Sequence, residues 1–344
     1  MISLLIVNYR SAALAAEAIR TARQWTSSPL QVVVVDNSCD ASEAEALRAH
    51  ADVLLVSRTN RGYAGAINDG RRACTGETIV VSNPDVTFSA GALDVLQYPL
   101  VKQRAAVAGP ALFWDDGQRW MLPPGDLSTG REKIDEVLAS RSRAWFEQRD
   151  RRRFLRRVAF WSQQETTRTT MLSGAVLAIR AADFDELSGF DERFLLYFEE
   201  TDFLRRVAQS RRRIVYVPAA RCRHVYNQSA GQVAGEAAAR YAQSEMLYLE
   251  KWNGPFAARA LKRLERPMQS YEVTDVTPPL ILSDSDVVVE ASPHPSFSTA
   301  AGHFPASSSV DLPPEVRASL RGDFYLRTVV RATGQVLGTY RIRA

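Results

Sequence analysis

Three carboxylates lie within four positions of the segment YFEETDFLRR, residues 197–206. Glu199, Glu200 and Asp202 follow two aromatic residues and precede two arginines. Such a group can bind a metal ion, supply a general base, or form the acidic first turn of a helix. Asp202 and Arg206 are four residues apart, which predicts an ordinary ion pair along a helix. We also expect the helix dipole to keep acids of its first turn ionised, the state that a base requires.

Polar side chains also follow apolar runs in the first third of the chain. Asp36 comes after four valines, and Asn8 follows the run SLLIV. The segment SNPDV ends another apolar run and holds Asn83 and Asp85 on either side of a proline. An amide and a carboxylate are oxygen ligands suited to a hard cation, although a ligand's phosphates would have to complete the shell. A turn with local side-chain hydrogen bonds explains the same residues without a ligand.

Two further segments have the residue types of a ligand site. NRGYAGAINDG, residues 60–70, has three glycines around the entry to a helix, whose first N–H groups favour anions. The glycines form neither GxGxxG nor the GxxxxGK[ST] phosphate loop, and close packing explains them equally well. His224 in RCRHVYNQS has no second His or Cys at zinc spacing, so it matters only if it shares a cleft with Asp85.

The elements that must position these residues alternate between strands and helices. Apolar runs separated by segments of helical spacing lie at residues 3–9, 31–37, 53–57 and 78–85. This alternation predicts a doubly wound α/β sheet. Ligands of such sheets bind at the carboxyl ends of the strands, which is where Asn8, Asp36 and SNPDV stand.

The composition limits the class of protein. The 344 residues are 46% hydrophobic and 24% charged with a net charge of +4, which indicates a globular chain that tolerates an anionic ligand. Three distant cysteines form no disulfide framework and predict a reducing compartment. The first residues indicate a buried strand rather than a signal peptide, and no apolar run reaches the roughly 20 residues of a membrane span. We therefore expect a cytoplasmic protein.

The chain changes character after about Pro267, where short alternating runs with Pro and Ser replace helical periodicity. We expect residues 1–267 to form the α/β domain and residues 268–344 a small β-rich accessory domain that ends in a hairpin around 332–335. We expect no chemistry in the accessory domain.

Residues 141–161 interleave eight arginines with aromatic residues. This segment is either a solvated helix with packing aromatics or a basic amphipathic segment, with arginines on anionic headgroups and aromatic rings inserted. We favour the second interpretation, and hence peripheral contact with the inner face of the cytoplasmic membrane. Nucleic acid is not expected as a partner, because no known binding module surrounds the segment.

Taken together and in this order, the motifs resemble a family-2 glycosyltransferase of the GT-A fold, and most closely the rhamnosyltransferase-type enzymes of bacterial polysaccharide assembly. The resemblance covers roughly residues 1–255 and rests on IVNYR, VVVVDNSCD, NRGYAGAINDG, SNPDV and the block from MLSGAVLAIR to HVYNQS. It implies that residues 1–105 form the nucleotide-sugar-binding half and residues 106–267 the acceptor and catalytic half.

The resemblance also implies roles for matching residues. Asp36 would contact the nucleotide, and Asn83 and Asp85 would flank a Mg²⁺ or Mn²⁺ ion on the donor diphosphate. His224 would join that metal site, although Asn227 replaces the family's glycine after the histidine. Further donor-side residues would be Asn8, Asn60, Gly62 and Asn68.

On the acceptor side the resemblance implies Glu199 and Gly174. The family has Glu-Asp-x-Asp where this chain has Glu199-Glu200-Thr201-Asp202. Glu200 therefore stands in the position of the catalytic base with a side chain one methylene longer, and Glu199 is the second candidate. Asp202 would be a structural partner.

The implied function is inverting, metal-dependent transfer of a sugar, with rhamnose favoured, from a TDP- or UDP-sugar to a saccharide or lipid-linked acceptor. A sugar nucleotidyltransferase would carry a GGxGTR loop after the first strand, where this chain has NYRSAALA. A non-catalytic sugar-binding or scaffold protein would not need the set Asp36, Asp85, Glu200 and His224.

Overall fold

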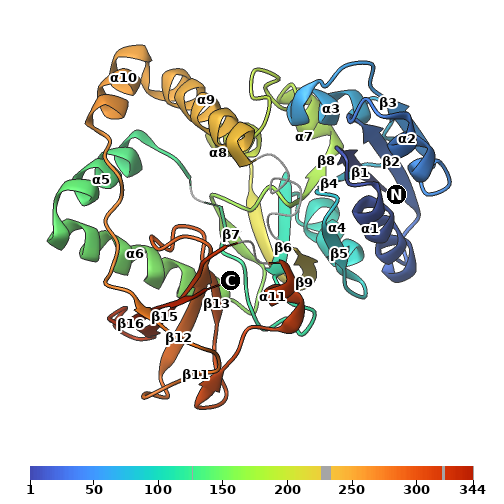
Figure 1. Ribbon diagram of the computed structural model, residues 1–344. Helices are drawn as coiled ribbons and strands as arrows, with labels where there is room; N and C mark the ends of the chain where they lie inside the picture. Colours follow the sequence, from blue (N-terminus) through green and yellow to red (C-terminus); the bar gives the residue numbers. More distant parts are fainter. Residues whose placement is uncertain (126, 226–233, 320–321, 344) are drawn as a thin grey trace. The chain divides into compact units, whose positions relative to one another are not determined.

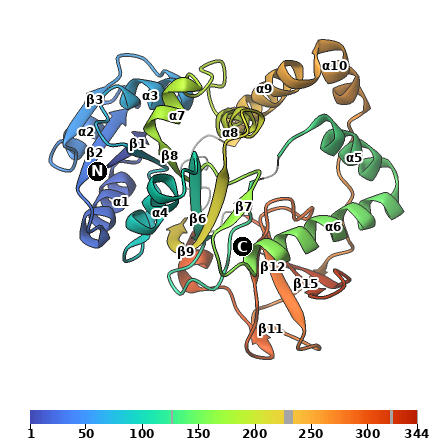
Figure 2. The same cartoon turned by 180° about the vertical axis from the view of Figure 1, so that it is seen from behind.

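A computed structural model describes residues 1–125, 127–225, 234–319 and 322–343 (Figures 1 and 2). The chain forms two compact units, which are considered one at a time. Unit 1 comprises Met1–Ala111, Gly125–Leu127 and Gln164–Lys251, and unit 2 comprises Leu112–Pro124, Ser128–Gln163 and Trp252–Ala344.

Unit 1 is built on one large sheet whose first half is parallel. Strands β3 (Val53–Val56), β2 (Leu30–Asp36), β1 (Ile2–Asn8) and β4 (Thr78–Ser82) lie side by side in that order. All residues of β1 and the valines of β2 are buried, as expected for strands with both faces covered. The four strands predicted from apolar runs are therefore confirmed.

The second half of the sheet contains antiparallel pairings. Its strands are β8 (Val176–Arg180), β6 (Val107–Phe113), β9 (Ile214–His224) and β5 (Val86–Phe88), with β7 (Thr167–Thr169) paired to β9. The β5–β9 register sets Val86 opposite His224. This pairing brings two segments that are distant in the sequence, SNPDV and RCRH, to the same place.

Helices connect these strands. They are α1 (Ala12–Trp25), α2 (Ala41–Arg48), α3 (Gly62–Arg71), α4 (Ala92–Lys102), α7 (Ala181–Glu186), α8 (Glu199–Gln209) and α9 (Ala234–Asn253). The predicted α/β fold class is confirmed. None of the described helices is long and apolar enough to cross a membrane.

Unit 2 combines helices with a small sheet. The helices are α5 (Gly130–Arg141), α6 (Arg143–Trp161), α10 (Pro255–Leu264) and α11 (Pro314–Ser319). The sheet has the order β10 (Thr274–Asp275), β16 (Val336–Ile342), β15 (Phe324–Val330), β12 (Val287–Ser292) and β13 (Ala301–His303), beside the pair β11 (Leu280–Ile281) and β14 (Ser309–Val310). The predicted C-terminal hairpin is β15–β16. The boundary at residue 267 stays a prediction, because unit 2 also contains α5 and α6.

The aromatic residues of α6 belong to the interior of unit 2. Phe154 and Trp161 pack with Val288 and Val329, and the Trp161 indole donates a hydrogen bond to the Leu122 carbonyl at 3.0 Å. Phe146 is buried as well. The expected insertion of these three rings into a membrane is therefore wrong, because all three are buried within unit 2.

A buried ionic network joins α6 to this sheet. The Arg327 guanidinium donates to both carboxylate oxygens of Asp150, at 2.7 and 3.1 Å, and to Glu290 at 2.7 Å. Arg157 lies 2.6 Å from the other Glu290 oxygen, and the Tyr271 hydroxyl donates to Asp150 at 3.0 Å. Both interpretations of residues 141–161 placed the charged side chains in solvent or on lipid headgroups. Arg157 and Asp150 lie instead in the interior of unit 2.

Removing one partner of this network should leave buried charges without compensation. We expect Arg327→Met to lower the free energy of unfolding by about 3–5 kcal/mol. Arg341→Met, on the neighbouring strand β16, breaks a more exposed pair with Asp275 that water and salt screen, and should cost far less. Urea denaturation of both variants measures the difference, and equal losses would show that the buried network does not stabilise unit 2.

Candidate active site

Asn8 and Asp36 lie at the carboxyl ends of adjacent parallel strands, in register with one another. The Asn8 amide donates to Asp36 Oδ1 at 2.9 Å and to Glu43 Oε2 at 3.0 Å, and both Asn8 and Asp36 are fully buried. Asp36 Oδ2 has no hydrogen-bond partner among the described residues. A buried acceptor without a partner is costly, so Asp36 is able to accept an N–H or hydroxyl of a ligand.

Asn60 and Gly62 shape the entry to α3. Asn60 Oδ1 accepts hydrogen bonds from the Asn37 amide and from the Gly62 backbone N–H, both at 2.9 Å. Gly62 has a φ of 71°, and a Cβ there would lie 2.7 Å from the Leu195 carbonyl oxygen. Glycine is therefore required for this close approach. Asn37 was not singled out from the sequence, although its place directly after Asp36 was a usable signal.

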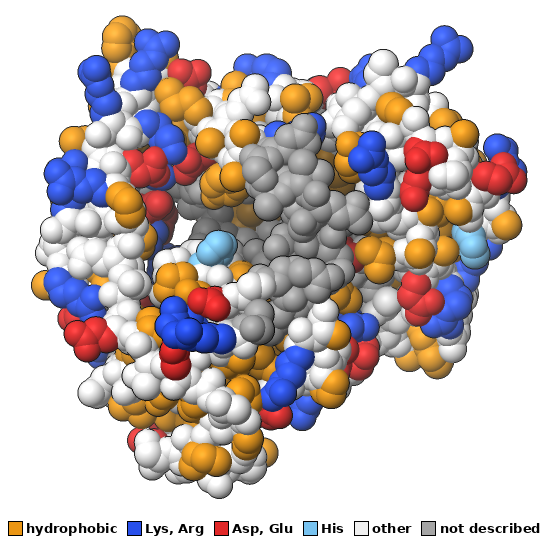
Figure 3. Space-filling view, viewed as in Figure 1, with side chains coloured by type: hydrophobic (Ala, Val, Ile, Leu, Met, Phe, Trp, Pro, Cys, Tyr) orange, Lys and Arg blue, Asp and Glu red, His pale blue; other side chains and the backbone are white. Residues whose placement is uncertain are grey.

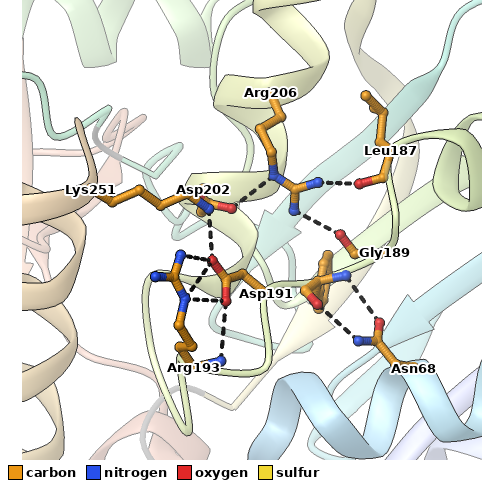
Figure 4. A network of polar contacts seen from close by, with 9 residues as sticks. Asn68, Leu187, Gly189, Asp191, Arg193, Asp202, Arg206 and Lys251 are labelled. Carbon is orange, nitrogen blue, oxygen red and sulfur yellow. Dashed lines mark hydrogen bonds and ion pairs between the residues drawn. The ribbon is translucent and has the colours of Figure 1, made fainter.

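Asn68 lies on α3 and holds a loop. Its amide donates to the Phe190 carbonyl at 2.8 Å and to Glu192 at 3.1 Å, and its oxygen accepts the Phe190 N–H at 3.0 Å (Figure 4). These bonds make Asn68 a positioning residue for the loop before α8. The expected donor contact of Asn68 stays a prediction.

Asp85 and His224 come together as the β5–β9 pairing requires. His224 Nε2 lies 3.2 Å from Asp85 Oδ1, and both side chains are buried. Asp85 Oδ1 makes no aligned hydrogen bond with any described residue, so this is a close approach rather than a donor–acceptor pair. When two ligand atoms each lie about 2.1 Å from one ion and the angle between them at the ion is about 90°, the two atoms are about 3 Å apart. The spacing thus fits a shared divalent cation.

The protein's own ligand set for such an ion is small. In the part of the chain that the structure describes, no group of three or more His, Cys, Asp or Glu could hold a metal ion. Oxygens from a bound diphosphate would therefore have to complete the coordination, as the sequence predicted for SNPDV. Asn227 lies outside the described residues.

Tyr63 connects the SNPDV turn to the carboxylates of α8. Its hydroxyl donates to Asn83 Oδ1 at 3.2 Å. Burial raises the pKa of Tyr63, and the negative charges of Glu199, Glu200 and Asp85 raise it further. The hydroxyl of the half-buried Tyr63 thus lies within electrostatic range of three predicted site residues. The sequence analysis missed Tyr63, whose signal was the aromatic position in NRGYAGAINDG.

The turn before α8 has an uncommon backbone. Tyr197 and Phe198 both have a φ of 69°, in the left-handed region that costs non-glycine residues on the order of 1 kcal/mol each. Phe198 packs on Tyr248 and Tyr241 of α9, with ring centroids 5.3 and 5.2 Å apart. Aromatic packing therefore stabilises the turn from which Glu199 and Glu200 project.

Burial controls the protonation of these two glutamates. Desolvation raises the pKa of Glu199, which is 5% exposed, well above its ordinary value, and the charge of Glu200 adds to this. Desolvation also raises the pKa of the partly exposed Glu200, while hydrogen bonds from the Glu200 and Thr201 backbone and from the Thr201 hydroxyl oppose it. Both pKa shifts are opposite in direction to the expected effect of the helix dipole, because desolvation outweighs the dipole.

The two glutamates differ enough to hold one proton between them. Like charges so close disfavour double ionisation, and Glu199 has the larger shift. Glu199 Oε2 has no hydrogen-bond partner among the described residues. The deeper burial of Glu199, and the hydrogen bonds that Glu200 accepts from Thr201, favour the proton on Glu199 when the pair holds one.

Gly174 provides the space for Glu200. A Cβ at position 174 would lie 2.8 Å from Glu200 Cγ and 3.1 Å from Cδ. Any larger residue would displace the candidate base. The expected contact of Gly174 with an acceptor stays a prediction.

Asp202 holds α8 in place rather than joining the two glutamates (Figure 4). Arg206 Nε donates to Asp202 Oδ2 at 2.9 Å, which confirms the predicted pair. Lys251 of α9 lies 2.7 Å from Asp202 Oδ1 and donates to Asp191 at 2.8 Å. Arg206 also donates to the carbonyls of Leu187 and Gly189. A buried acid thus anchors α8 to the preceding loop and to α9.

The raised pKa of Glu199 predicts a pH-dependent stability. A carboxyl with a folded pKa above its ordinary 4.5 stabilises the fold below that value, and this contribution is lost as the pH rises through the folded pKa. Glu199→Gln mimics the protonated form at every pH. Its melting temperature should match that of the wild type at about pH 5 and exceed it at about pH 8.

Thermal unfolding at both pH values tests this expectation. Glu45→Gln on α2 is the control, because Glu45 is exposed and should change stability little at either pH. A Glu199→Gln variant that is less stable than the wild type at about pH 8 would contradict the inferred protonation.

The chain is similar in sequence to one protein family and to two known proteins. The family described as Glycosyltransferase like family 2 matches residues 1–242, which include every predicted site residue. Two relatives named N-acetylglucosaminyl-diphospho-decaprenol L-rhamnosyltransferase, from Mycobacterium tuberculosis strains CDC 1551 / Oshkosh and ATCC 25618 / H37Rv, are each 27% identical over 242 residues. The match covers 65% of this chain and 76% of each relative.

Two solved structures are similar in part. The mannosyltransferase PcManGT from Pyrobaculum calidifontis, in complex with GDP-Man and Mn²⁺, is 17% identical with a TM-score of 0.49, covering 76% of this chain and 69% of that chain. GalNAc-T7 with UDP, GalNAc and Mn²⁺ is 15% identical with a TM-score of 0.48, covering 66% and 43%. Both TM-scores are below 0.5, so the assignment rests on the family match. The chain belongs to the glycosyltransferase-like family 2, and it is a glycosyltransferase, as its motifs predicted.

Proposed function

We propose that this enzyme transfers a sugar, with L-rhamnose the first candidate, from a TDP- or UDP-sugar to a saccharide on a lipid diphosphate. The name of the mycobacterial relatives specifies a rhamnosyl transfer to a decaprenol-linked N-acetylglucosaminyl diphosphate. The observation that carries the proposal is the position of the Tyr63 hydroxyl, bonded to Asn83 and within electrostatic range of Asp85, Glu199 and Glu200. This position of the Tyr63 hydroxyl supports a diphosphate site and a general base that lie close to one another.

On the donor side, Asp36 accepts a hydrogen bond from the nucleotide through its free Oδ2. Asp85 and His224 would hold a Mg²⁺ or Mn²⁺ ion against the donor diphosphate, a role that their 3.2 Å separation supports. When bound, such an ion neutralises charge that develops on the departing nucleoside diphosphate. Tyr63 orients Asn83 beside this site.

On the acceptor side, the Glu200 carboxylate removes the proton from the attacking hydroxyl. The acceptor oxygen bonds to the anomeric carbon from the face opposite the nucleotide, so the sugar's configuration inverts and the diphosphate leaves. A raised pKa makes Glu200 a stronger base than an ordinary glutamate while it is ionised. Protonated Glu199 can donate a hydrogen bond to an acceptor oxygen.

The proposed metal role predicts a specific loss of donor binding. Asp85→Asn removes the carboxylate but keeps the side chain's size, and should weaken Mn²⁺-dependent binding of TDP by about tenfold or more. Titration calorimetry with and without Mn²⁺ measures the effect, with Glu45→Gln as the control. If Mn²⁺ strengthens TDP binding equally in Asp85→Asn and wild type, Asp85 is not a ligand.

The proposed base predicts a loss of transfer without a loss of binding. Glu200→Gln should lower kcat by about 10²–10⁴-fold and leave TDP affinity unchanged. In the wild type, kcat should fall on the acidic side with a midpoint above pH 4.5, because the pKa of Glu200 is raised from that value.

Transfer from TDP-rhamnose to a short-chain N-acetylglucosaminyl diphosphate lipid is the assay. Full activity of Glu200→Gln would reject Glu200 as the base, and the same measurement on Glu199→Gln would then test the second candidate. A thermal-shift series of TDP- and UDP-sugars with Mn²⁺ identifies the donor by the largest stabilisation.

A further inference from the structure

Helix α10 has an apolar surface that faces solvent. Phe256 is 85% exposed and Leu264 is 47% exposed, and Ala257 and Ala260 are exposed beside them. Ala258 is buried on the opposite side, and the Leu264 carbonyl accepts a hydrogen bond from Arg141 of α5 at 2.9 Å. The helix is therefore held to unit 2 by one side and presents a different side outward.

The outward side is divided into an apolar and a basic strip. With about 100° per residue, Phe256, Ala257, Ala260 and Leu264 span an arc of about 100°. Arg259 and Arg263 are exposed on the adjoining arc, whereas Lys262 is half-buried and lies 2.6 Å from Glu265. Figure 3 shows Lys and Arg side chains together with hydrophobic ones at the upper left, where Figure 1 has α10.

The start of α10 projects the exposed phenylalanine. Gly254 has a φ of 83° with open space where a side chain would be, and Pro255 occupies the first helical turn. This Gly-Pro pair ends α9 and begins a separate short helix. Phe256 consequently stands at a helix end, where it is least covered.

We propose that α10 docks the enzyme on an anionic lipid surface, with Phe256 and Leu264 among the headgroups and Arg259 and Arg263 against their phosphates. An amphipathic helix of this kind lies in the interface plane, bound by its apolar strip and by attraction to anionic lipids. This inference deepens the proposed function, because an acceptor on a lipid diphosphate would be presented at such a surface. It can fail while the proposed transfer reaction stands.

Helix α10 suits this role better than residues 141–161. The rings of Phe146, Phe154 and Trp161 are buried. Several arginines of that segment are engaged by acids, including Arg152 with Asp135 at 2.8 Å and Arg156 with Glu132 at 3.0 Å. On α10 the apolar residues are the exposed ones, and the basic residues flank them.

Co-sedimentation of the full chain with vesicles tests the proposal. Wild type should bind vesicles containing about 30% phosphatidylglycerol, bind pure phosphatidylcholine weakly, and lose binding at about 0.5 M salt. Phe256→Ser and Arg263→Glu should each lower the apparent affinity for the anionic vesicles about tenfold. Both residues are exposed, so the variants should fold normally.

Matched controls separate the helix from general surface effects. Ile281→Ser removes an apolar side chain that is 70% exposed elsewhere in unit 2, and Arg151→Glu reverses an exposed charge on α6. Both should bind vesicles as the wild type does. The proposal is overturned if wild type does not bind anionic vesicles, or if Phe256→Ser binds them with unchanged affinity.

Two further readouts distinguish other outcomes. Transfer to an acceptor without a lipid chain should be unchanged in Phe256→Ser, so loss of vesicle binding with retained transfer supports the docking role alone. Light scattering tests whether the α10 surface binds a second copy of the chain instead of a membrane. If the wild type is a dimer that does not bind vesicles, and Phe256→Ser is a monomer, the surface is a dimer interface and the membrane proposal is wrong.

Discussion

The candidate active site depends on one fully buried carboxylate. Asp202 is contacted by Arg206 from its own helix and by Lys251 from α9, so its charge is balanced from two elements. Breaking a buried pair by removing one partner leaves an uncompensated charge, which makes these contacts strongly coupled. The position of α8, and with it the direction of Glu199 and Glu200, follows from this arrangement.

The ion pairs of Asp202 allow the fold to hold a site whose own backbone and side chains are energetically unfavourable. Two consecutive residues in the left-handed region, and a buried glutamate beside a partly exposed one, each raise the free energy of the fold. The aromatic packing of Phe198 on α9 and the ion pairs of Asp202 offset these costs. Burial then has a chemical result, since it raises the pKa values of both glutamates above their ordinary value.

The sequence analysis could predict what depends on local pattern. The parallel strands, the Asp202–Arg206 pair and the C-terminal hairpin follow from periodicity and spacing, and they are confirmed. Desolvation depends on tertiary packing, so the protonation of Glu199 and the burial of the α6 aromatics could not be obtained from one segment. Tyr63 and Asn37 were missed for the same reason: their hydrogen bonds join segments that only the fold brings together.

The contact between Gly62 and Leu195 limits how this enzyme can change its substrates. The Tyr63 amide donates to the Leu195 carbonyl at 2.7 Å, and no side chain fits at Gly62 between them. The start of α3 and the turn that carries the glutamates are therefore held against each other through their backbones. A chimaera that takes residues 60–70 from one relative should need the matching 194–200 segment as well, so the two segments are exchanged together.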